Sequence, residues 1–255
     1  MGDFLIYEAP QGTEEWLEAR AGKITASMVS TIRAKVNMPT EQQQKYIDAV
    51  LSGMTEAQAL EAAKYKAKPR AAVIDKALSG EQVGEWSTSA LDYAFRLAVE
   101  RIAGVPLDEG FQTWAMKRGN ELEPYARMAH EEASGLIVQP TGFIATPDGK
   151  FGASADGFSN DGAGCEYKCF IAPDKLREFW FDFDPSCVMD QIQMGMWISG
   201  KKKWHLGVYC SALKDAGKEL WLKTIDRDDD YIEKMESDLV EFEKLVTEYE
   251  MKLRA

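Results

Sequence analysis

Cysteine and histidine are scarce in this sequence, whose 255 residues include four cysteines and two histidines. Four cysteines are too few for a disulfide framework in a chain of this length, and no Cys-x-x-Cys pair occurs. The two histidines stand far apart in the sequence, so a structural zinc site is not expected either. Any bound metal is therefore expected to be a hard cation held by carboxylates.

Long apolar runs are also lacking. No stretch approaches the ~18 consecutive apolar residues of a membrane span. The first residues, from Met1 to Ile6, have neither a basic segment nor a long apolar stretch, so they do not match a secretory signal. We therefore expect a soluble cytoplasmic protein that does not contact the membrane.

The chain is acidic, with 42 acidic and 30 basic side chains and a net charge of −12. The segment from Asp226 to Glu250 alone holds eleven acids and three bases, so the remainder is close to neutral and can include a local basic groove. The net charge therefore does not decide whether nucleic acid binds. Apolar residues make up 45% of the chain, enough for a sizeable core, which argues against disorder.

The order of predicted elements indicates an α/β (α+β) fold, a central mixed β-sheet flanked by helices, in a single domain of residues 1–255. Helices are predicted over 13–21, 25–32, 87–104, 120–134 and 185–199, with a final amphipathic helix after 226. Strands are predicted at 137–138, 142–145, 150–158, 164–170, 203–209 and 219–225. The turn Asn160-Asp161-Gly162 joins two of these strands into a β-hairpin.

Residues 38–82 differ from the rest, because they form short helices rich in Ala and Lys and carry no strand signal. We predict a small helical insertion here. Its faint helix-turn-helix character suggests contact with DNA, but a surface helical hairpin is the simpler interpretation of such a weak motif.

The hairpin carries the sharpest chemical signal, Asp156 followed by Glu166-Tyr167-Lys168. Side chains two apart in a strand share a face, so Glu166 and Lys168 point one way and Tyr167 points toward the core. Two carboxylates and a lysine suit Mg²⁺ chemistry on a phosphodiester, because Mg²⁺ prefers oxygen ligands and keeps several waters. On these residues alone, an exposed cross-strand salt bridge, which is common, is the favoured interpretation.

Asp156 and the run Glu166-x-Lys168 are similar to the signature of the PD-(D/E)xK nucleases. Five ordered segments resemble one branch of that superfamily, the phage lambda alkaline exonuclease and YqaJ-type viral recombinase family. They are Trp16 to Ser27, Arg118 to Arg127, Ser154 to Gly157, Glu166 to Cys169 and Asp190 to Trp197. Ala155 stands where the family often has proline, and residues 38–82 are not explained by the resemblance.

The resemblance implies a role for each matching residue. The catalytic set would be Asp156, Glu166, Lys168, Glu123 and Gln191, with Lys168 acting on the attacking water. The metal ligands would be Asp156, Glu166 and the backbone carbonyl of Tyr167. A pocket for a terminal 5′-phosphate would be formed by Arg20, Ser27 and Ser154; Arg20 offers a planar donor fork and Ser27 stands near a predicted helix start.

The resemblance further implies an enzyme, a Mg²⁺-dependent (or Mn²⁺-dependent) exonuclease that degrades one strand of linear double-stranded DNA from 5′ to 3′. Its partners would be DNA ends and a single-strand annealing protein, in a trimeric ring within the bacterial host of a phage or prophage. No iron–sulfur cluster is expected, since no cysteine precedes Cys165. Two alternatives stay open: a structure-specific or restriction-type endonuclease, and a non-catalytic interaction module.

Overall fold

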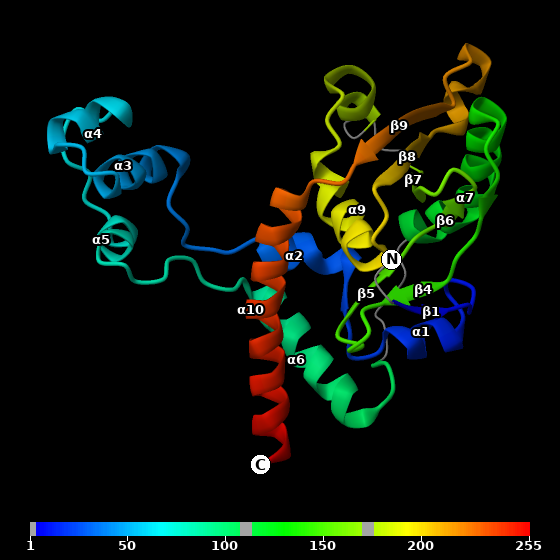
Figure 1. The fold of residues 1–255 in the computed structure, drawn as a ribbon, viewed down its shortest axis with the longest axis horizontal. Helices are drawn as coiled ribbons and strands as arrows, with labels where there is room; N and C mark the ends of the chain where they lie inside the picture. Colours follow the sequence, from blue (N-terminus) through cyan, green and yellow to red (C-terminus); the bar gives the residue numbers. More distant parts are fainter. Residues whose placement is uncertain (1–3, 108–113, 170–175) are drawn as a thin grey trace. The chain divides into compact units, whose positions relative to one another are not determined.

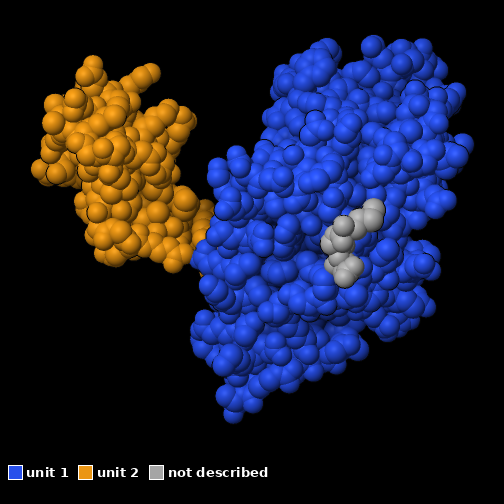
Figure 2. Space-filling model, viewed as in Figure 1, with its two compact units in different colours: residues 1–30, 92–255 blue, residues 31–91 orange. Residues whose placement is uncertain are grey.

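The computed structural model describes residues 4–107, 114–169 and 176–255. The chain forms two compact units, coloured separately in Figure 2. The first consists of residues 1–30 and 92–255, and the second of residues 31–91. The predicted insertion, residues 38–82, falls inside the second unit.

The strands of the first unit form two mixed sheets (Figure 1). The four-stranded sheet has the order β1 (Leu5–Tyr7), β4 (Phe143–Ala145), β5 (Phe151–Ser154) and β2 (Ile24–Thr25), with β2 parallel to β5. The five-stranded sheet has the order β3 (Val138–Gln139), β6 (Gly157–Ser159), β7 (Gly164–Lys168), β8 (Lys203–Tyr209) and β9 (Leu220–Asp226). Only β7 and β8 run parallel in this sheet, and a parallel pair needs a long crossover, which contains a helix here. The predicted fold class is confirmed.

The predicted strand 150–158 is two strands in the structure. It breaks at Ala155 and Asp156, where the chain leaves β5 in the four-stranded sheet and enters β6 in the five-stranded sheet. The hairpin itself forms as predicted, with Gly157 opposite Cys165 and Phe158 opposite Gly164. The predicted end of its second strand, Phe170, lies outside the described residues. The break places Asp156 at the point where the two sheets meet.

Most helical segments of the first unit lie close to where local signals predict, with one exception at the start of a long helix, and the short turns at 178–182 and 211–216 were not predicted. They are α1 (Glu14–Arg20), the 3₁₀ turn η1 (Ala26–Met28), most of α6 (Thr88–Ala103), α7 (Trp114–Ser134), the π turn η2 (Glu178–Asp182), α9 (Ser186–Ser199), the 3₁₀ turn η3 (Ser211–Ala216) and α10 (Asp229–Arg254). Thr13 caps α1 by accepting from the Trp16 amide, and Gly200, with φ of +69°, ends α9. None of the helices among the described residues has the length and apolar character of a membrane span.

The exception is α7. The sequence predicts a helix start near Asn120 with Pro124 in the first turn, but the helix already begins by Trp114, so Pro124 lies in its interior. Proline has no N–H to bond the carbonyl four residues earlier, which belongs to Asn120. The helix nevertheless continues, because its inner face is buried through Leu122 and Ala126.

Both faces of β7 are covered. On one side Cys165 and Tyr167 pack in a cluster with Leu122 and Ala126 of α7. On the other side α9 covers the neighbouring strand β8 around Trp204, which is 1% exposed. A Cβ at Gly164 or Gly195 would lie 2.4 or 2.6 Å from the Trp204 ring, so glycine at these positions allows the close approach of α9 to the sheet. This close packing sets the distance from α9 to the carboxyl end of β7, where Lys168 lies.

The second unit contains α3 (Glu41–Leu51), α4 (Glu56–Ala62) and α5 (Ala72–Leu78), and the short α2 (Val29–Arg33) crosses its boundary. Thr40 with Gln43, and Thr55 with Gln58, form capping boxes at the starts of α3 and α4. The three helices share a core of their own, made of Tyr46, Ile47, Ala49, Ala59, Ala63 and Ile74. This unit therefore has the helical character that its sequence predicts.

Candidate active site

The hairpin brings Asp156 beside the strand that carries Glu166 and Lys168. The Asp156 amide donates to the Cys165 carbonyl at 3.0 Å, and its carboxylate accepts from the Tyr167 amide at 2.5 Å. Asp156 is 8% exposed and Glu166 is 3% exposed. Two carboxylates are thus held in a buried position by the backbone of β7.

Lys168, Glu166 and Gln191 form a closed group of hydrogen bonds. The Lys168 ammonium donates to Glu166 Oε1 at 2.7 Å and to Gln191 Oε1 at 2.9 Å. The Gln191 amide nitrogen donates to the same Glu166 oxygen at 2.8 Å. Gln191 stands on α9, so the helix that covers the sheet also orients the catalytic candidates of β7.

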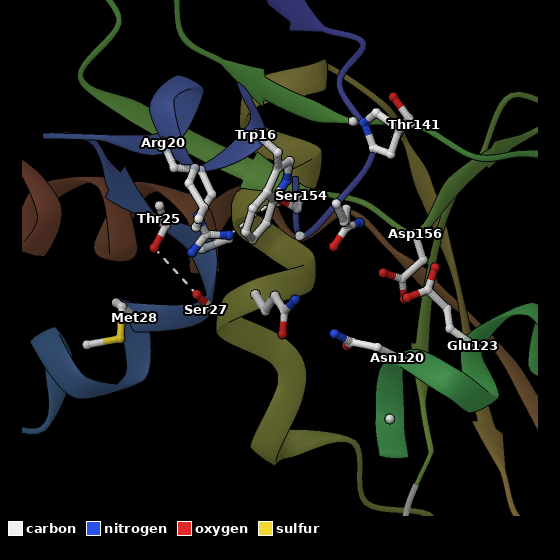
Figure 3. A pocket seen from close by; sticks show the side chains of 18 of the residues that line it. Trp16, Arg20, Thr25, Ser27, Met28, Asn120, Glu123, Thr141, Ser154 and Asp156 are labelled. Carbon is white, nitrogen blue, oxygen red and sulfur yellow. Dashed lines mark hydrogen bonds between the residues drawn. The ribbon is translucent and has the colours of Figure 1, made fainter. Parts of the chain in front are cut away.

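A third carboxylate, Glu123 of α7, joins the site from the other side of β7. Figure 3 shows the Glu123 and Asp156 side chains pointing toward one another. Burial raises the pKa of Glu123, and the nearby Glu166 charge raises it further. Both Glu123 and its neighbour Asn120 line the same cavity as Asp156.

The electrostatics of the group reflect crowded negative charge. Burial raises the pKa of Asp156 well above its usual range, and the Glu166 and Glu123 carboxylates add to this. For Lys168, burial lowers the pKa, but attraction to Glu166 and their hydrogen bond outweigh it, so the pKa is raised. Three carboxylates facing one lysine leave the site short of positive charge.

These residues line one end of a cavity of about 1150 Å³ in the first unit. Arg20, Ser27 and Ser154 line the same cavity. Figure 3 shows Arg20 and Ser27 on one side, Asp156 and Glu123 on the other, and Ser154 between them. The structure therefore places all the site residues expected from the sequence around one cavity.

Trp16 is a site residue for which the sequence suggested no role. Its indole N–H donates to the Ser154 hydroxyl at 3.1 Å, and the Arg20 guanidinium carbon lies 4.1 Å from the centre of its ring. Arg20 Nη1 is 3.5 Å from the same hydroxyl. The available signal was the i, i+4 spacing of Trp16 and Arg20 on α1, which puts the two side chains on one face.

Ser27 lies in the 3₁₀ turn η1, and not in a regular helix as predicted. Its hydroxyl is exposed and lies 3.4 Å from the Thr25 hydroxyl, shown by the dashed line in Figure 3. Thr25 stands at the N-cap position of η1, but its side chain makes no capping hydrogen bond. Its backbone amide donates to the Tyr93 hydroxyl at 3.1 Å. A cluster of hydroxyls, rather than a helix terminus, therefore faces the cavity beside Arg20.

The two histidines, distant in sequence, lie together behind β7. The rings of His130 and His205 are 5.2 Å apart, and His130 Nδ1 is 2.8 Å from the Tyr167 hydroxyl. Burial lowers the pKa of His130, and the charge of His205 lowers it further. This contact supports β7 from the face opposite the carboxylates.

The carboxylates could hold a divalent cation, although the described residues do not form a complete metal cage. Among residues 4–107, 114–169 and 176–255, no three side chains of His, Cys, Asp or Glu are gathered closely enough for a complete metal site. Mg²⁺ does not require one, since it binds through one or two carboxylates and keeps several waters. The raised pKa of Asp156 fits this use, because a cation would relieve the repulsion that causes it.

Comparisons with known proteins show which family this chain belongs to. The model of the YqaJ-like viral recombinase domain matches residues 15–202. The chain belongs to this family. The family match runs through all of the segments that contribute Arg20, Glu123, Asp156, Lys168 and Gln191. It also runs through residues 38–82, which the sequence resemblance left unexplained.

Solved structures share the fold of this family member. An alkaline exonuclease from Laribacter hongkongensis is 25% identical with a TM-score of 0.66, and the match covers 95% of this chain and 97% of that one. The same exonuclease in complex with dAMP gives a TM-score of 0.65 at 25% identity and the same coverage. A phage-related exonuclease from Haemophilus somnus 129PT is 14% identical with a TM-score of 0.50, over 91% of this chain and 95% of that one, and shows the fold alone. The comparison with curated proteins gave no match.

Proposed function

We propose that this protein is a divalent-metal-dependent exonuclease that degrades one strand of linear double-stranded DNA. The observation that carries the proposal is the cavity in which Asp156, Glu166 and Glu123 converge around Lys168. Membership of the YqaJ-like family and the likeness to an alkaline exonuclease support the same activity. Buried like charges are costly and are typical of catalytic sites.

Asp156, Glu166 and the backbone carbonyl of Tyr167 would hold Mg²⁺, or Mn²⁺ in its place. When bound, the cation supplies positive charge at the scissile phosphate and makes water more acidic. Glu123 would add negative charge on the side of α7, where its carboxylate faces Asp156. These donors fit a hard cation, since all of them are oxygens.

Lys168 would act on the attacking water and on the phosphate. An ammonium group has three N–H donors, and two of them are used by Glu166 and Gln191. The third remains for water or a phosphate oxygen. Gln191 and Glu166 thereby fix the direction of the remaining donor, which is the positioning that phosphoryl chemistry requires.

Arg20, Ser154 and Ser27 would bind the 5′-phosphate at the far end of the cavity. Arg20 is held over the Trp16 ring, and Ser154 is held by the Trp16 indole. A guanidinium binds phosphate in a bidentate manner, and hydroxyls add donors. Holding a terminal phosphate at a fixed distance from the carboxylates would explain hydrolysis from the 5′ end, with 3′ single-stranded overhangs as the product.

We extend the proposal, on the family resemblance, to phage-type recombination in the cytoplasm of a bacterial host. A single-strand annealing protein would take up the overhangs, and three copies of the chain would form a ring around DNA. Mass measurement at working concentration tests the ring, and a strict monomer would contradict it.

The activity is tested by digesting a linear duplex that carries a 5′-phosphate on one strand, with Mg²⁺ and with chelator. We expect metal-dependent loss of the phosphorylated strand, strongly slowed loss with Lys168→Ala, and normal loss with the exposed control Lys202→Ala. Cutting of closed circular DNA would favour the endonuclease alternative. Folded protein that digests nothing with Mg²⁺ or Mn²⁺ would favour the non-catalytic module.

A further inference from the structure

The second unit differs from the chain as a whole in its charge. Residues 31–91 hold eight basic and seven acidic side chains, whereas the whole chain has a net charge of −12. Four of the eight bases stand within seven residues, Lys64, Lys66, Lys68 and Arg70, in the loop between α4 and α5. We call residues 64–70 the basic loop. All four of its basic side chains are exposed.

The basic loop is anchored to the core of its unit rather than merely solvated. Gln42 of α3 donates to the carbonyls of Ala63 and Lys64 at 3.0 and 3.3 Å. The Tyr65 amide donates to the Leu60 carbonyl at 2.8 Å, and the Tyr65 ring meets the Tyr46 ring edge-on at 6.0 Å. The chain therefore turns at a defined point, and the inward Tyr65 leaves its basic neighbours outside.

The basic side chains of the loop form few ion pairs with the described residues. Of the four, only Lys68 forms an ion pair with a described residue, an exposed contact of 3.7 Å with Glu56. Other exposed lysines are paired along their helices, such as Lys45 with Glu41 at 2.6 Å and Lys252 with Glu248. An exposed pair contributes little to stability, so even Lys68 can exchange its partner. The basic loop thus concentrates positive charge that ion pairs with the described residues leave largely unneutralised.

We propose that the basic loop binds the phosphate backbone of duplex DNA, as a contact additional to the active-site cavity. The described residues that line that cavity belong to the first unit, whereas the basic loop belongs to the second. The inference rests on the proposed function, since a nuclease that acts on duplex ends must hold the duplex as well as the scissile strand. Four basic side chains on a short anchored segment suit neighbouring phosphates, which are read by charge and not by base sequence.

The test measures DNA binding by the full chain in the Lys168→Ala background with chelator, so that the DNA stays intact. The loop variant is K64Q/K66Q/K68Q/R70Q. The matched control, K45Q/K76Q/K234Q/K244Q, removes the same charge from exposed positions elsewhere. A third variant, K64R/K66R/K68R, preserves the charge. Circular dichroism and thermal melts check that all variants fold alike.

Affinity for a fluorescent blunt duplex is measured by anisotropy over a range of salt concentrations. Each lost phosphate contact lowers the slope of log affinity against log salt by about 0.9, so we expect the slope to fall by roughly 3–4 for the loop variant. At low salt its affinity should fall by about tenfold or more, while the arginine variant keeps its affinity and the control changes little.

Equal binding by the loop variant and the matched control would overturn the inference and leave the proposed nuclease function intact. A change in the mass of the assembly with unchanged DNA affinity would also overturn it, and would assign the basic loop to a protein contact. If the parent Lys168→Ala protein binds no duplex at all, both the inference and the proposed function fail.

Discussion

Replacing Gln191 with methionine removes the amide that joins Lys168 to Glu166 while keeping a side chain of similar size. The amide donates to Glu166 Oε1 at 2.8 Å and accepts from Lys168 at 2.9 Å. Gln191 lies next to the buried residues of α9, and methionine is similar to it in size, so α9 should keep its position. The expected effect is therefore a loss of catalytic rate without a loss of fold.

The magnitude follows from the two hydrogen bonds, each of which has a charged partner. Such bonds contribute about 1.5–3 kcal/mol, and a tenfold change in rate corresponds to about 1.4 kcal/mol. If the free energy of one such bond orients Lys168 in the transition state, the rate should fall by roughly 10- to 100-fold. Gln191→Glu should lose more, because it keeps the acceptor for Lys168 but adds a negative charge next to Glu166.

The assay is single-turnover digestion of a 5′-phosphorylated linear duplex with Mg²⁺, with affinity measured separately. A double-mutant cycle with Lys168→Ala tells whether Gln191 acts through the lysine. If it does, Gln191→Met should cost little further rate in that background. Full activity of folded Gln191→Met, or losses that simply multiply in the double mutant, would refute the assignment.

Three further predictions concern the carboxylates, the 5′ end and the core. Asp156→Asn should raise the Tm of the metal-free protein by a few degrees at pH 8, since about 1 kcal/mol moves the Tm of a domain this size by roughly 2–4 °C. The pKa of Asp156 is raised in the folded protein, so its carboxylate destabilises the fold as the pH rises through that pKa. The increase in Tm caused by Asp156→Asn should therefore be smaller at lower pH. Trp16→Ala should reduce the preference for a 5′-phosphate over a 5′-hydroxyl end in competition digests, whereas Trp16→Phe, which keeps the ring under Arg20, should reduce it less. Gly164→Ala, whose Cβ would lie 2.4 Å from Trp204, should destabilise the protein by about 1–3 kcal/mol in urea unfolding, and an unchanged midpoint would contradict the described packing.

Local patterns predicted the elements that carry the site. The period of two in Glu166-Tyr167-Lys168 predicts which side chains share a face, and the structure buries Tyr167 with α7 while Lys168 meets Gln191. The turn at Asp161 predicts the hairpin that brings Asp156 to this strand. The predicted start of α7 is too late in the sequence. Proline is typical of the first turn of a helix, but Pro124 lies in the interior of α7, where burial of the helix face stabilises the continued helix.

The sequence by itself determined that two carboxylates and a lysine stand together on one hairpin, because strand period and turn chemistry act over a few residues. Only the tertiary structure decided that Glu123 faces Asp156, that Gln191 bridges Lys168 and Glu166, and that Trp16 reaches Ser154. Those contacts join segments far apart in the chain, and they exist because the chain changes sheet at Asp156 and α9 packs closely on Trp204. No local pattern encodes such distances, since they are set by the packing of whole helices and sheets.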